Sequence, residues 1–371
     1  MREADGPERE SPEEAALEEA GRLMRICNAC RYCEGLCAVF PAMELRRDFA
    51  AADLTYLANL CHACGACYFD CQYAPPHAFR VNVPQTFARL RRQSYRAYAW
   101  PRALAPLFAR NGLAVALTAA LSLAGFLLGF LAAADPALLF GRLEGPGAFY
   151  AIMPHGLMVL LFGGAFLYAL LALCLGLRAF WRETALPRPS ARALRQAARD
   201  AGRLRYLDGG GLGCHDADER PDGRRRLFHH LTFYGFLLCL ASTAAATLAH
   251  YLLGWQAPYG WLSLPVILGS LGGLGLVIGP AGLALAKRRR HPDLDEAAGQ
   301  GMDRAFLAML FLVGLSGLAL LVLRATPAMG TLLALHLGFV FAFFLTLPYG
   351  KFVHGLYRYL ALVRYALERP G

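Results

Sequence analysis

Six long apolar stretches dominate the chain beyond residue 110. They cover residues 112–134, 151–177, 231–253, 261–286, 305–323 and 331–355. Each meets or approaches the roughly 20 residues that a helix needs to cross about 30 Å of hydrocarbon. Arg-rich or Pro- and Gly-containing segments separate them. The pattern therefore predicts an α-helical integral membrane protein, with a transmembrane domain of about six helices over residues 101–371.

The first hundred residues are polar and predict a separate N-terminal domain. Residues 21–100 contain eight of the eleven cysteines, and Pro101 marks the joint with the apolar part. Residues 1–20 are rich in Glu and have no apolar core, so we expect a disordered acidic lead and no processing signal there. The amphipathic segment Met43–Leu60 predicts a helix between two groups of cysteines.

Composition supports a membrane location. Hydrophobic residues make up 57% of the chain and charged residues 17%, whereas a soluble domain has about 45–50% and about 25%. The net charge of +10 comes from arginines that flank the apolar stretches, which argues against a nucleic-acid partner. If six spans are crossed, nearly all basic residues fall on one side. The positive-inside rule then places the N-terminal domain and both termini in the cytoplasm, at the inner membrane.

Two cysteine runs have the same spacing, x2-x2-x3. They are Cys27, Cys30, Cys33 and Cys37, then Cys61, Cys64, Cys67 and Cys71. This is the spacing of bacterial ferredoxins, in which three thiolates bind one [4Fe–4S] cluster and the fourth reaches the other cluster. The prediction is an α-helical ferredoxin-like domain in which Cys71 completes the first cluster and Cys37 the second. Structural zinc is the alternative, but zinc sites usually use two well-separated ligand pairs.

Histidines at the ends of two predicted spans are candidate haem ligands. His229, His230 and His250 bracket the third span, and His336 and His354 lie in the sixth. His336 and His354 are 18 residues apart, which in one helix puts them on one face about 27 Å apart. Two antiparallel helices of this kind could hold two haems b, an inner one at His229 and His354 and an outer one at His250 and His336.

The alternative for these histidines is a structural role at the membrane interface. His230 would point away from His250 unless the first turn is distorted, which makes His229 the better inner candidate. His155, near the outer end of the second span, is a weaker candidate ligand or quinone contact. Cys214 lies in a predicted loop, and its thiol could be either inert or a redox sensor.

No substrate chemistry can be read from the chain. The glycine-rich segment Gly269–Gly282 lies inside an apolar span, so we expect close helix packing there and no nucleotide cradle. No dinucleotide fingerprint, phosphate loop or nucleophile–base pair occurs. The prediction is an electron carrier without a substrate site of its own other than a quinone site, and a membrane redox sensor or a heterodisulfide- or thiol-linked respiratory subunit is the alternative.

Several motifs together resemble one family. Besides the cysteine runs, they are Tyr73-Ala-Pro-Pro-His77, Gly213-Cys-His-Asp-Ala-Asp-Glu-Arg-Pro221, His229-His-Leu-Thr-Phe-Tyr-Gly-Phe236 and Leu347-Pro-Tyr-Gly-Lys-Phe-Val-His-Gly355. With these motifs the chain resembles the TcuB/CitB family of tricarballylate (citrate) utilization proteins and the membrane part of CobZ. The resemblance extends from about residue 24 to the end of the chain. The resemblance implies an FAD-containing dehydrogenase partner (TcuA-like), electron transfer to membrane quinone, and the eight cysteines as cluster ligands. It also makes haem b expected without identifying the ligands.

Overall fold

The protein was analysed as a computed structural model that describes residues 11–218 and 220–369. Helix α1 (Pro12–Cys30) begins at a capping box, in which the Ser11 hydroxyl accepts the Glu14 N–H and the Glu14 carboxylate accepts the Ser11 N–H. This reciprocal pair satisfies free N–H groups of the first turn. The predicted lead over 1–20 is therefore wrong for residues 12–20, which are helical, and its residues 1–10 lie outside the described residues.

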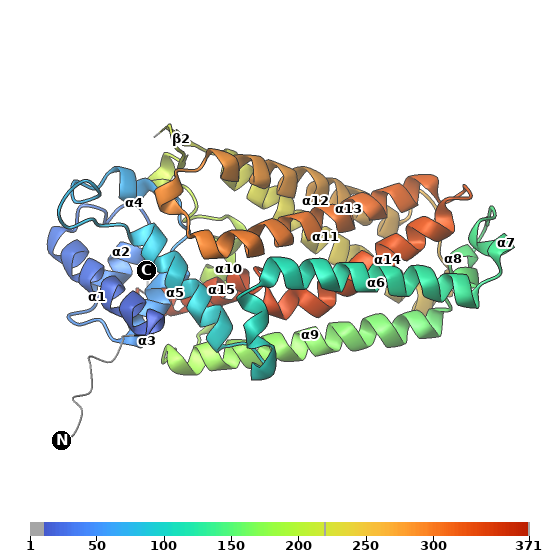
Figure 1. The fold of residues 1–371 in the computed structure, drawn as a ribbon, viewed down its shortest axis with the longest axis horizontal. Coiled ribbons are helices and arrows are strands. Elements are labelled where there is room, and N and C mark those ends of the chain that lie inside the picture. Colours follow the sequence, from blue (N-terminus) through green and yellow to red (C-terminus); the bar gives the residue numbers. More distant parts are fainter. Residues whose placement is uncertain (1–10, 219, 370–371) are drawn as a thin grey trace, which may run out of the picture.

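Helices α1 to α5 form a small domain at one end of the molecule (Figure 1). After α1 come α2 (Val39–Glu44), α3 (Ala51–Leu60), α4 (Ala66–Phe69) and α5 (Val83–Ala97). Its core includes Leu23, Met24, Phe40, Tyr56, Leu57 and Phe87. The helix expected over Met43–Leu60 is two helices, α2 and α3, because the chain turns between them. Cys27 and Cys30 lie in the last turn of α1 and Cys67 lies in α4, and the other five cysteines of the two runs lie in the segments that connect these helices.

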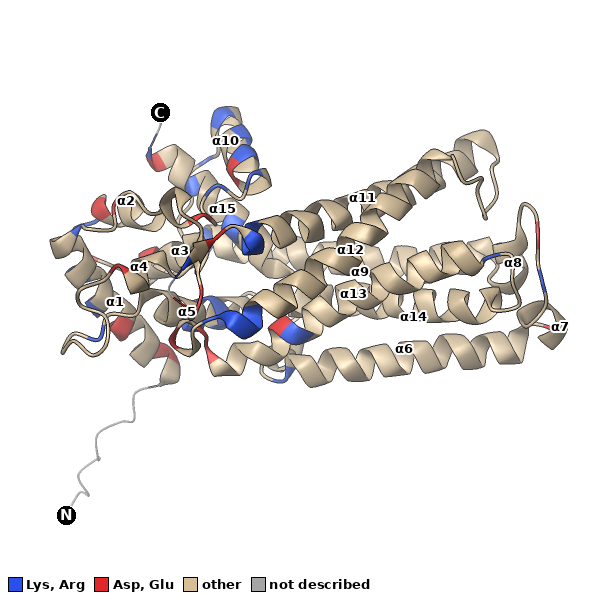
Figure 2. Ribbon diagram, turned by 90° about the horizontal axis from the view of Figure 1, so that it is seen from above, with Lys and Arg blue, Asp and Glu red and all other residues tan. Residues whose placement is uncertain are grey.

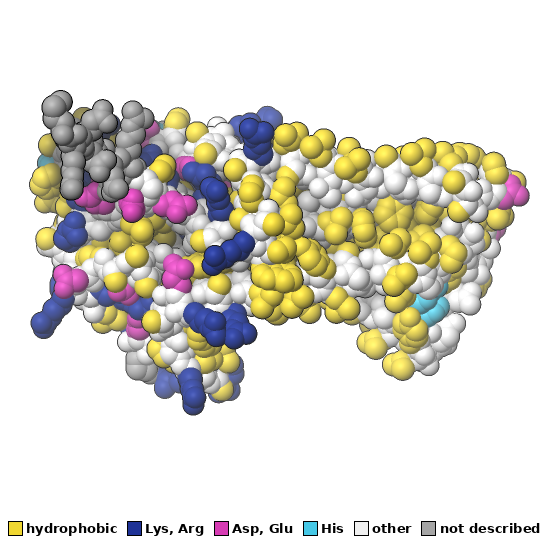
Figure 3. All heavy atoms as spheres, turned by 60° about the horizontal axis from the view of Figure 1, so that its bottom comes forward, with side chains coloured by type: hydrophobic (Ala, Val, Ile, Leu, Met, Phe, Trp, Pro, Cys, Tyr) yellow, Lys and Arg dark blue, Asp and Glu magenta, His cyan; other side chains and the backbone are white. Residues whose placement is uncertain are grey.

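Six long apolar helices extend from this domain (Figure 1). They are α6 (Asn111–Ala133), α9 (His155–Glu183), α11 (Arg224–Leu253), α12 (Leu264–Arg289), α13 (Gln300–Leu323) and α14 (Met329–Thr346). All six are long and apolar enough to cross a membrane. Many leucines on them face outward, as at Leu121, whose side chain is 73% exposed. Figure 3 shows hydrophobic side chains covering the elongated part and charged ones gathered at the other end. The protein is a multi-pass membrane protein.

The last predicted span, 331–355, is interrupted. Helix α14 ends at Thr346, the 3₁₀ turn η5 (Leu347–Tyr349) follows, and α15 (Val353–Glu368) begins after Gly350. Pro348 has no N–H to continue the helical hydrogen bonds. The Tyr349 hydroxyl anchors the break by donating to the Trp100 carbonyl at 2.9 Å. The sequence interpretation was wrong here because apolar residues continue across the break.

The long connection between α9 and α11 folds back onto the cysteine domain. It contains α10 (Ala191–Gly202), the 3₁₀ turn η2 (Gly209–Gly211) and a two-stranded ribbon of β1 (Cys214–His215) and β2 (Pro221–Asp222). The His215 N–H donates to the Cys64 carbonyl at 2.9 Å. Helix α10 packs against α15. This loop therefore closes one side of the domain around the second cysteine run.

Glycines bring α11 and α12 into close contact. A Cβ added at Gly275 would lie 2.7 Å from the Leu231 carbonyl oxygen and 2.9 Å from Gly235 Cα. A Cβ at Gly279 would lie 2.6 Å from the Thr232 nitrogen. The backbones can approach this closely only because side chains are missing at the contact. The packing role predicted for Gly269–Gly282 is confirmed.

Basic residues gather where the small domain meets the helical bundle (Figure 2). The connections there include η1 (Arg102–Phe108), η3 (Pro292–Leu294) and η4 (Ala297–Gly299). At the far end, where α7 (Pro136–Leu139) and α8 (Ala148–Ile152) lie, Figure 2 shows few charged residues. The charge asymmetry along the long axis agrees with the positive-inside pattern read from the sequence.

Candidate functional site

Five cysteines line a cavity of about 290 Å³ in the small domain, Cys67 and a group of four: Cys27, Cys30, Cys33 and Cys71. Cys27 and Cys30 come from the last turn of α1, Cys33 from the following turn, and Cys71 from the loop after α4. We call this group the peripheral site. Burial raises the pKa of Cys27 to about 12, and the neighbouring thiols of Cys33, Cys71 and Cys30 add to that shift. The four thiols are thus close enough to repel one another as thiolates.

The other four cysteines lie deeper. The thiols that act electrostatically on Cys37 are those of Cys64 and Cys61, and Cys67 is influenced by all three. We call Cys37, Cys61, Cys64 and Cys67 the inner site. Burial is the main cause that raises the pKa of Cys37 and of Cys67 well above the usual value. Gly65 adopts a left-handed conformation (φ 93°), which suits glycine and turns the chain between Cys64 and Cys67.

The grouping is the crossed one, in which each site takes its fourth cysteine from the other run. The peripheral thiols surround a cavity rather than a point, which fits a cluster better than a single ion. In the part of the chain that the structure describes, no three or more His, Cys, Asp or Glu side chains are arranged to hold one metal ion. Cys33 also acts on Cys67, so the two sites are neighbours.

Four arginines donate hydrogen bonds to the carbonyls of residues 58–63, beside the inner site. Arg91 of α5 reaches Ala58 and Cys61 at 2.8 and 3.2 Å, and Arg358 of α15 reaches Cys61 at 2.8 Å. The other two, Arg225 and Arg290, lie at the start of α11 and directly after the end of α12. We call the four side chains the arginine collar: Arg91, Arg225, Arg290 and Arg358.

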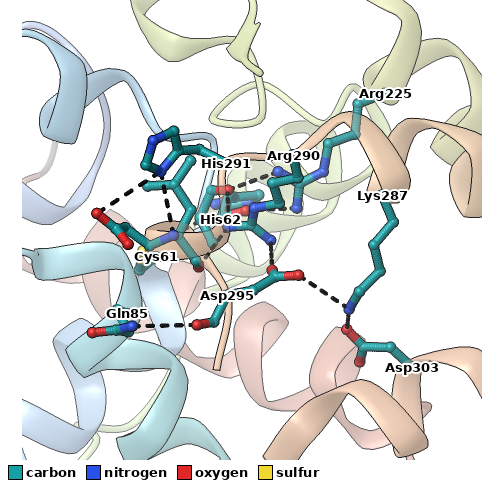
Figure 4. Close-up of polar contacts among 12 residues, drawn as sticks. Cys61, His62, Gln85, Arg225, Lys287, Arg290, His291, Asp295 and Asp303 are labelled. Atoms are coloured by element: carbon teal, nitrogen blue, oxygen red, sulfur yellow. Dashed lines mark hydrogen bonds and ion pairs between the residues drawn. The ribbon is translucent and has the colours of Figure 1, made fainter. Parts of the chain in front are cut away.

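Arg225 and Arg290 join the first turn of α11 and the end of α12 to the cysteine loop. Arg225 donates to the Ala63 carbonyl at 2.7 Å, and Arg290 donates to the same carbonyl at 3.1 Å (Figure 4). Burial and the nearby Arg225 lower the pKa of Arg290 to about 10. Burial, with Arg91, also lowers the pKa of Arg358 to about 10. Arg290 and Arg358 therefore stay charged at neutral pH.

A buried ion network continues from the collar toward the membrane (Figure 4). Arg290 pairs with Asp295 at 2.9 Å, and Asp303 at the start of α13 pairs with both Lys287 and Lys351. These are the only two lysines of the chain. The Lys351 carbonyl contacts Nδ1 of His354. The network therefore fixes the turn at Lys351, directly before α15, which carries His354.

His229 and His354 lie face to edge at the inner end of the bundle. Their ring centroids are 6.2 Å apart with an interplanar angle of 71°. The contact of His354 Nδ1 with the Lys351 carbonyl leaves Nε2 free to act as a ligand, an arrangement common for metal-binding histidines. The predicted inner pair is therefore brought together, although its members come from α11 and α15. His230 points elsewhere and contacts the ring of Tyr234.

His62 lies next to the inner site and is influenced by His229 of this pair. It follows Cys61 directly, and His229 is among the groups that influence its charge. Burial and the guanidinium of Arg358 hold the pKa of His62 well below its usual range, so the ring is neutral. Its Nδ1 contacts the Leu60 carbonyl at 2.9 Å. A neutral ring thus lies beside the cysteine loop and close enough to His229 to be influenced by it.

The predicted outer pair of His250 and His336 is not formed. His250 stacks on His155, with ring centroids 3.8 Å apart and an angle of 18°, beside Tyr150. His336 instead contacts the Ser316 hydroxyl through Nδ1 at 3.0 Å. The prediction fails because α14 does not present His336 to α11; α11 packs mainly on α12. The second span, through His155, supplies the neighbour of His250.

Sequence reasoning missed the arginine collar and gave too little weight to His155. The collar arginines look like ordinary basic residues at the ends of spans, and no local motif marks them. Cys214 is buried beside Cys64, with which it interacts electrostatically. The motif Gly213–Pro221 was the available signal, because a distinctive loop sequence far from the cysteines indicated a specific contact.

Two family models match the chain in consecutive parts. The model described as citrate utilization protein B matches residues 106–371, and that of the citrate utilization protein B Fer4-like domain matches residues 20–97. A curated protein from Escherichia coli, "Citrate utilization protein B", is 49% identical over 355 residues, which is 95% of this chain and 92% of the relative. No solved structure matches the chain. The Fer4-like match supports iron–sulfur clusters in the small domain.

Proposed function

The chain belongs to the citrate utilization protein B family, and from this premise we propose that it is the membrane electron-transfer subunit of a dehydrogenase complex. The electron donor would be an FAD-containing dehydrogenase that oxidises tricarballylate or a related tricarboxylate, and the acceptor would be quinone in the cytoplasmic membrane. One observation carries the proposal. Neighbouring groups connect the two cysteine sites to the membrane histidines: Cys33 acts on Cys67, His62 directly follows Cys61, and His229 acts on His62 and lies 6.2 Å from His354 between ring centroids.

Two [4Fe–4S] clusters, when bound, would supply one-electron carriers with potentials set by their surroundings. The chain's own part is to hold them in the crossed order and to exclude water from the inner one. Cys61 and Cys64 are buried, and the loop with Cys214 and His215 covers them. Tyr32, 73% exposed, stands at the rim of the peripheral cavity. This favours entry of electrons at the peripheral site.

The inner histidine pair fits the two ligands of one haem b. A ring nitrogen binds a metal at about 2.0–2.1 Å, so two imidazoles on opposite sides of one iron have centroids roughly 6.3 Å apart. The rings of His229 and His354 are 6.2 Å apart. Nδ1 of His229 is buried without a hydrogen bond, which leaves the ring free to reorient. At the outer end, His155 and not His336 lies beside His250, but their ring centroids are 3.8 Å apart, which is closer than two ligands on opposite sides of one iron require.

The proposed orientation puts the small domain and both chain ends in the cytoplasm. The support is the accumulation of Lys and Arg at the junction and their scarcity at the far end (Figure 2). A cytoplasmic small domain can meet a soluble dehydrogenase. It also keeps the eight thiols in a reducing compartment, where clustered cysteines bind metal more often than they form disulfides.

The test is a difference spectrum of reduced minus oxidised protein, purified without oxygen in detergent. Iron, acid-labile sulfide and extractable haem are measured on the same sample. We expect about eight non-haem irons per chain, sharp haem b bands, and oxidation of the reduced protein by a water-soluble quinone. Clusters that do not react with quinone would favour a redox sensor. A colourless protein that contains zinc would refute the proposal.

A further inference from the structure

The arginine collar carries more positive charge than its surroundings neutralise. Among the described residues, Arg290 is the one collar member with a carboxylate within ion-pair distance, Asp295 at 2.9 Å. Arg91 is buried, and its guanidinium bonds only to carbonyls. Four guanidinium charges and one carboxylate leave a net charge of three. Arg91 is buried and the other three are half-buried. Like charges in such surroundings repel more strongly than in water because the protein screens them poorly, so a nearby anion would stabilise this arrangement.

The inner site would supply that anion. A [4Fe–4S] cluster with four thiolates carries a net charge of about −2 when oxidised and about −3 when reduced. The collar donates to the carbonyls of Cys61, His62 and Ala63, which belong to the loop that holds the inner site. Each guanidinium group therefore donates to the carbonyl of a proposed ligand or of the residue next to one in the sequence. Their attraction grows with each electron added to this site.

The peripheral site has the opposite surroundings. Asp70 is one of the charges that raise the pKa of Cys33. The one arginine that hydrogen-bonds to a carbonyl of the first cysteine loop is Arg31, which donates to Asn28 at 3.1 Å in the described structure and is exposed. Water and salt screen an exposed charge far more than a buried one. The electrostatic balance thus favours the reduced state at the inner site and disfavours it at the peripheral site.

We infer that the arginine collar gives the inner site a higher reduction potential than the peripheral site, and so directs electrons from the exposed end of the small domain toward the membrane. The inference rests on the proposed function only in that both sites hold clusters. It concerns the sharing of one electron between two sites, with no bond or proton change. Net charge and hydrogen bonding are known determinants of cluster potential. The collar arginines are positioning and tuning residues, not ligands.

The experiment is a redox titration of the full-length protein in detergent, followed by low-temperature electron paramagnetic resonance. A Cys30→Ser variant identifies the peripheral signal. In the wild type we expect an equilibrium constant of at least ten in favour of the inner site, which is about 59 mV for one electron. Arg358→Gln and Arg225→Gln should each lower this constant about three- to tenfold, a fall of roughly 30–59 mV in the inner potential.

Two controls separate charge from structure. Arg358→Lys keeps the charge and should retain most of the wild-type potential, and Arg31→Gln removes an exposed arginine and should leave the inner potential unchanged. A higher potential at the peripheral site in the wild type would overturn the inference, and this outcome needs no variant to fold. So would an inner potential that Arg358→Gln and Arg225→Gln leave unchanged while both clusters are present. A protein without clusters would refute the proposed function instead.

Discussion

Replacing Gly275 by alanine should separate α11 from α12. The added Cβ would lie 2.7 Å from the Leu231 carbonyl oxygen and 2.9 Å from Gly235 Cα. Both are backbone atoms, so neither can rotate away. Carbon contacts are optimal at about 3.5–4.0 Å, which requires the helices to move apart by roughly 0.6–1 Å at this point.

The expected energetic cost is that of overpacking, about 1–3 kcal/mol. For a domain of 150–250 residues, 1 kcal/mol shifts the melting temperature by about 2–4 °C, so the variant should melt roughly 2–12 °C lower. The displacement also affects function, because α11 carries both Arg225 and His229. We therefore expect the haem bands to weaken or shift in the same variant.

The assay is thermal unfolding in one detergent at one heating rate. Membrane proteins commonly unfold irreversibly, and their apparent melting temperature then depends on the rate of unfolding and on the heating rate. The matched control is Gly164→Ala, inside the apolar helix α9, where an added Cβ meets nothing within 4 Å. This control should melt at or slightly above the wild-type temperature, because alanine favours helix. If Gly275→Ala behaves like Gly164→Ala, the close approach of α11 and α12 described here is wrong.

Three further outcomes follow from the sites. Cys64→Ser should remove about four of about eight non-haem irons while the peripheral signal persists. Iron analysis that shows the loss of both clusters, or of neither cluster, would contradict two separate sites. His354→Ala should abolish the inner haem band in the reduced spectrum, whereas His336→Ala should keep every haem band; a band lost with His336 would contradict the revised pairing. Asp303→Asn leaves Lys287 and Lys351 without their shared carboxylate and should destabilise the protein by about 3 kcal/mol, measured as a fall in melting temperature; an unchanged temperature would show that the network is not stabilising.

The sequence was a good guide where the determining signal is local. The length of an apolar stretch predicts a span because a helix must cover a fixed thickness of hydrocarbon, and all six spans have a helical counterpart. The cysteine spacing likewise predicts which thiols can share a site. In the structure Cys71 influences Cys27, and Cys61 and Cys64 influence Cys37. Which thiols bind one cluster together stays a prediction.

The sequence was a poor guide where helices must be placed relative to one another. The spacing of His336 and His354 indicated one face of one helix, but the break at Pro348 puts them on two helices. The pairing of His250 with His155 depends on how α11 is rotated and packed. That rotation is set by contacts such as Gly235 on Gly275, which link residues far apart in the sequence.

The arginines show why counting charges could not reveal the collar. The positive-inside rule treats every basic residue near a span end alike, and it counted Arg91, Arg225, Arg290 and Arg358 with the rest. In the structure these four turn inward to carbonyls of the small domain. Exposed arginines such as Arg102, with others in the 178–228 connection, remain available to the membrane surface. The positive-inside pattern therefore remains when the collar arginines are not counted. The negative charge of an occupied inner site explains why the four collar arginines lie together.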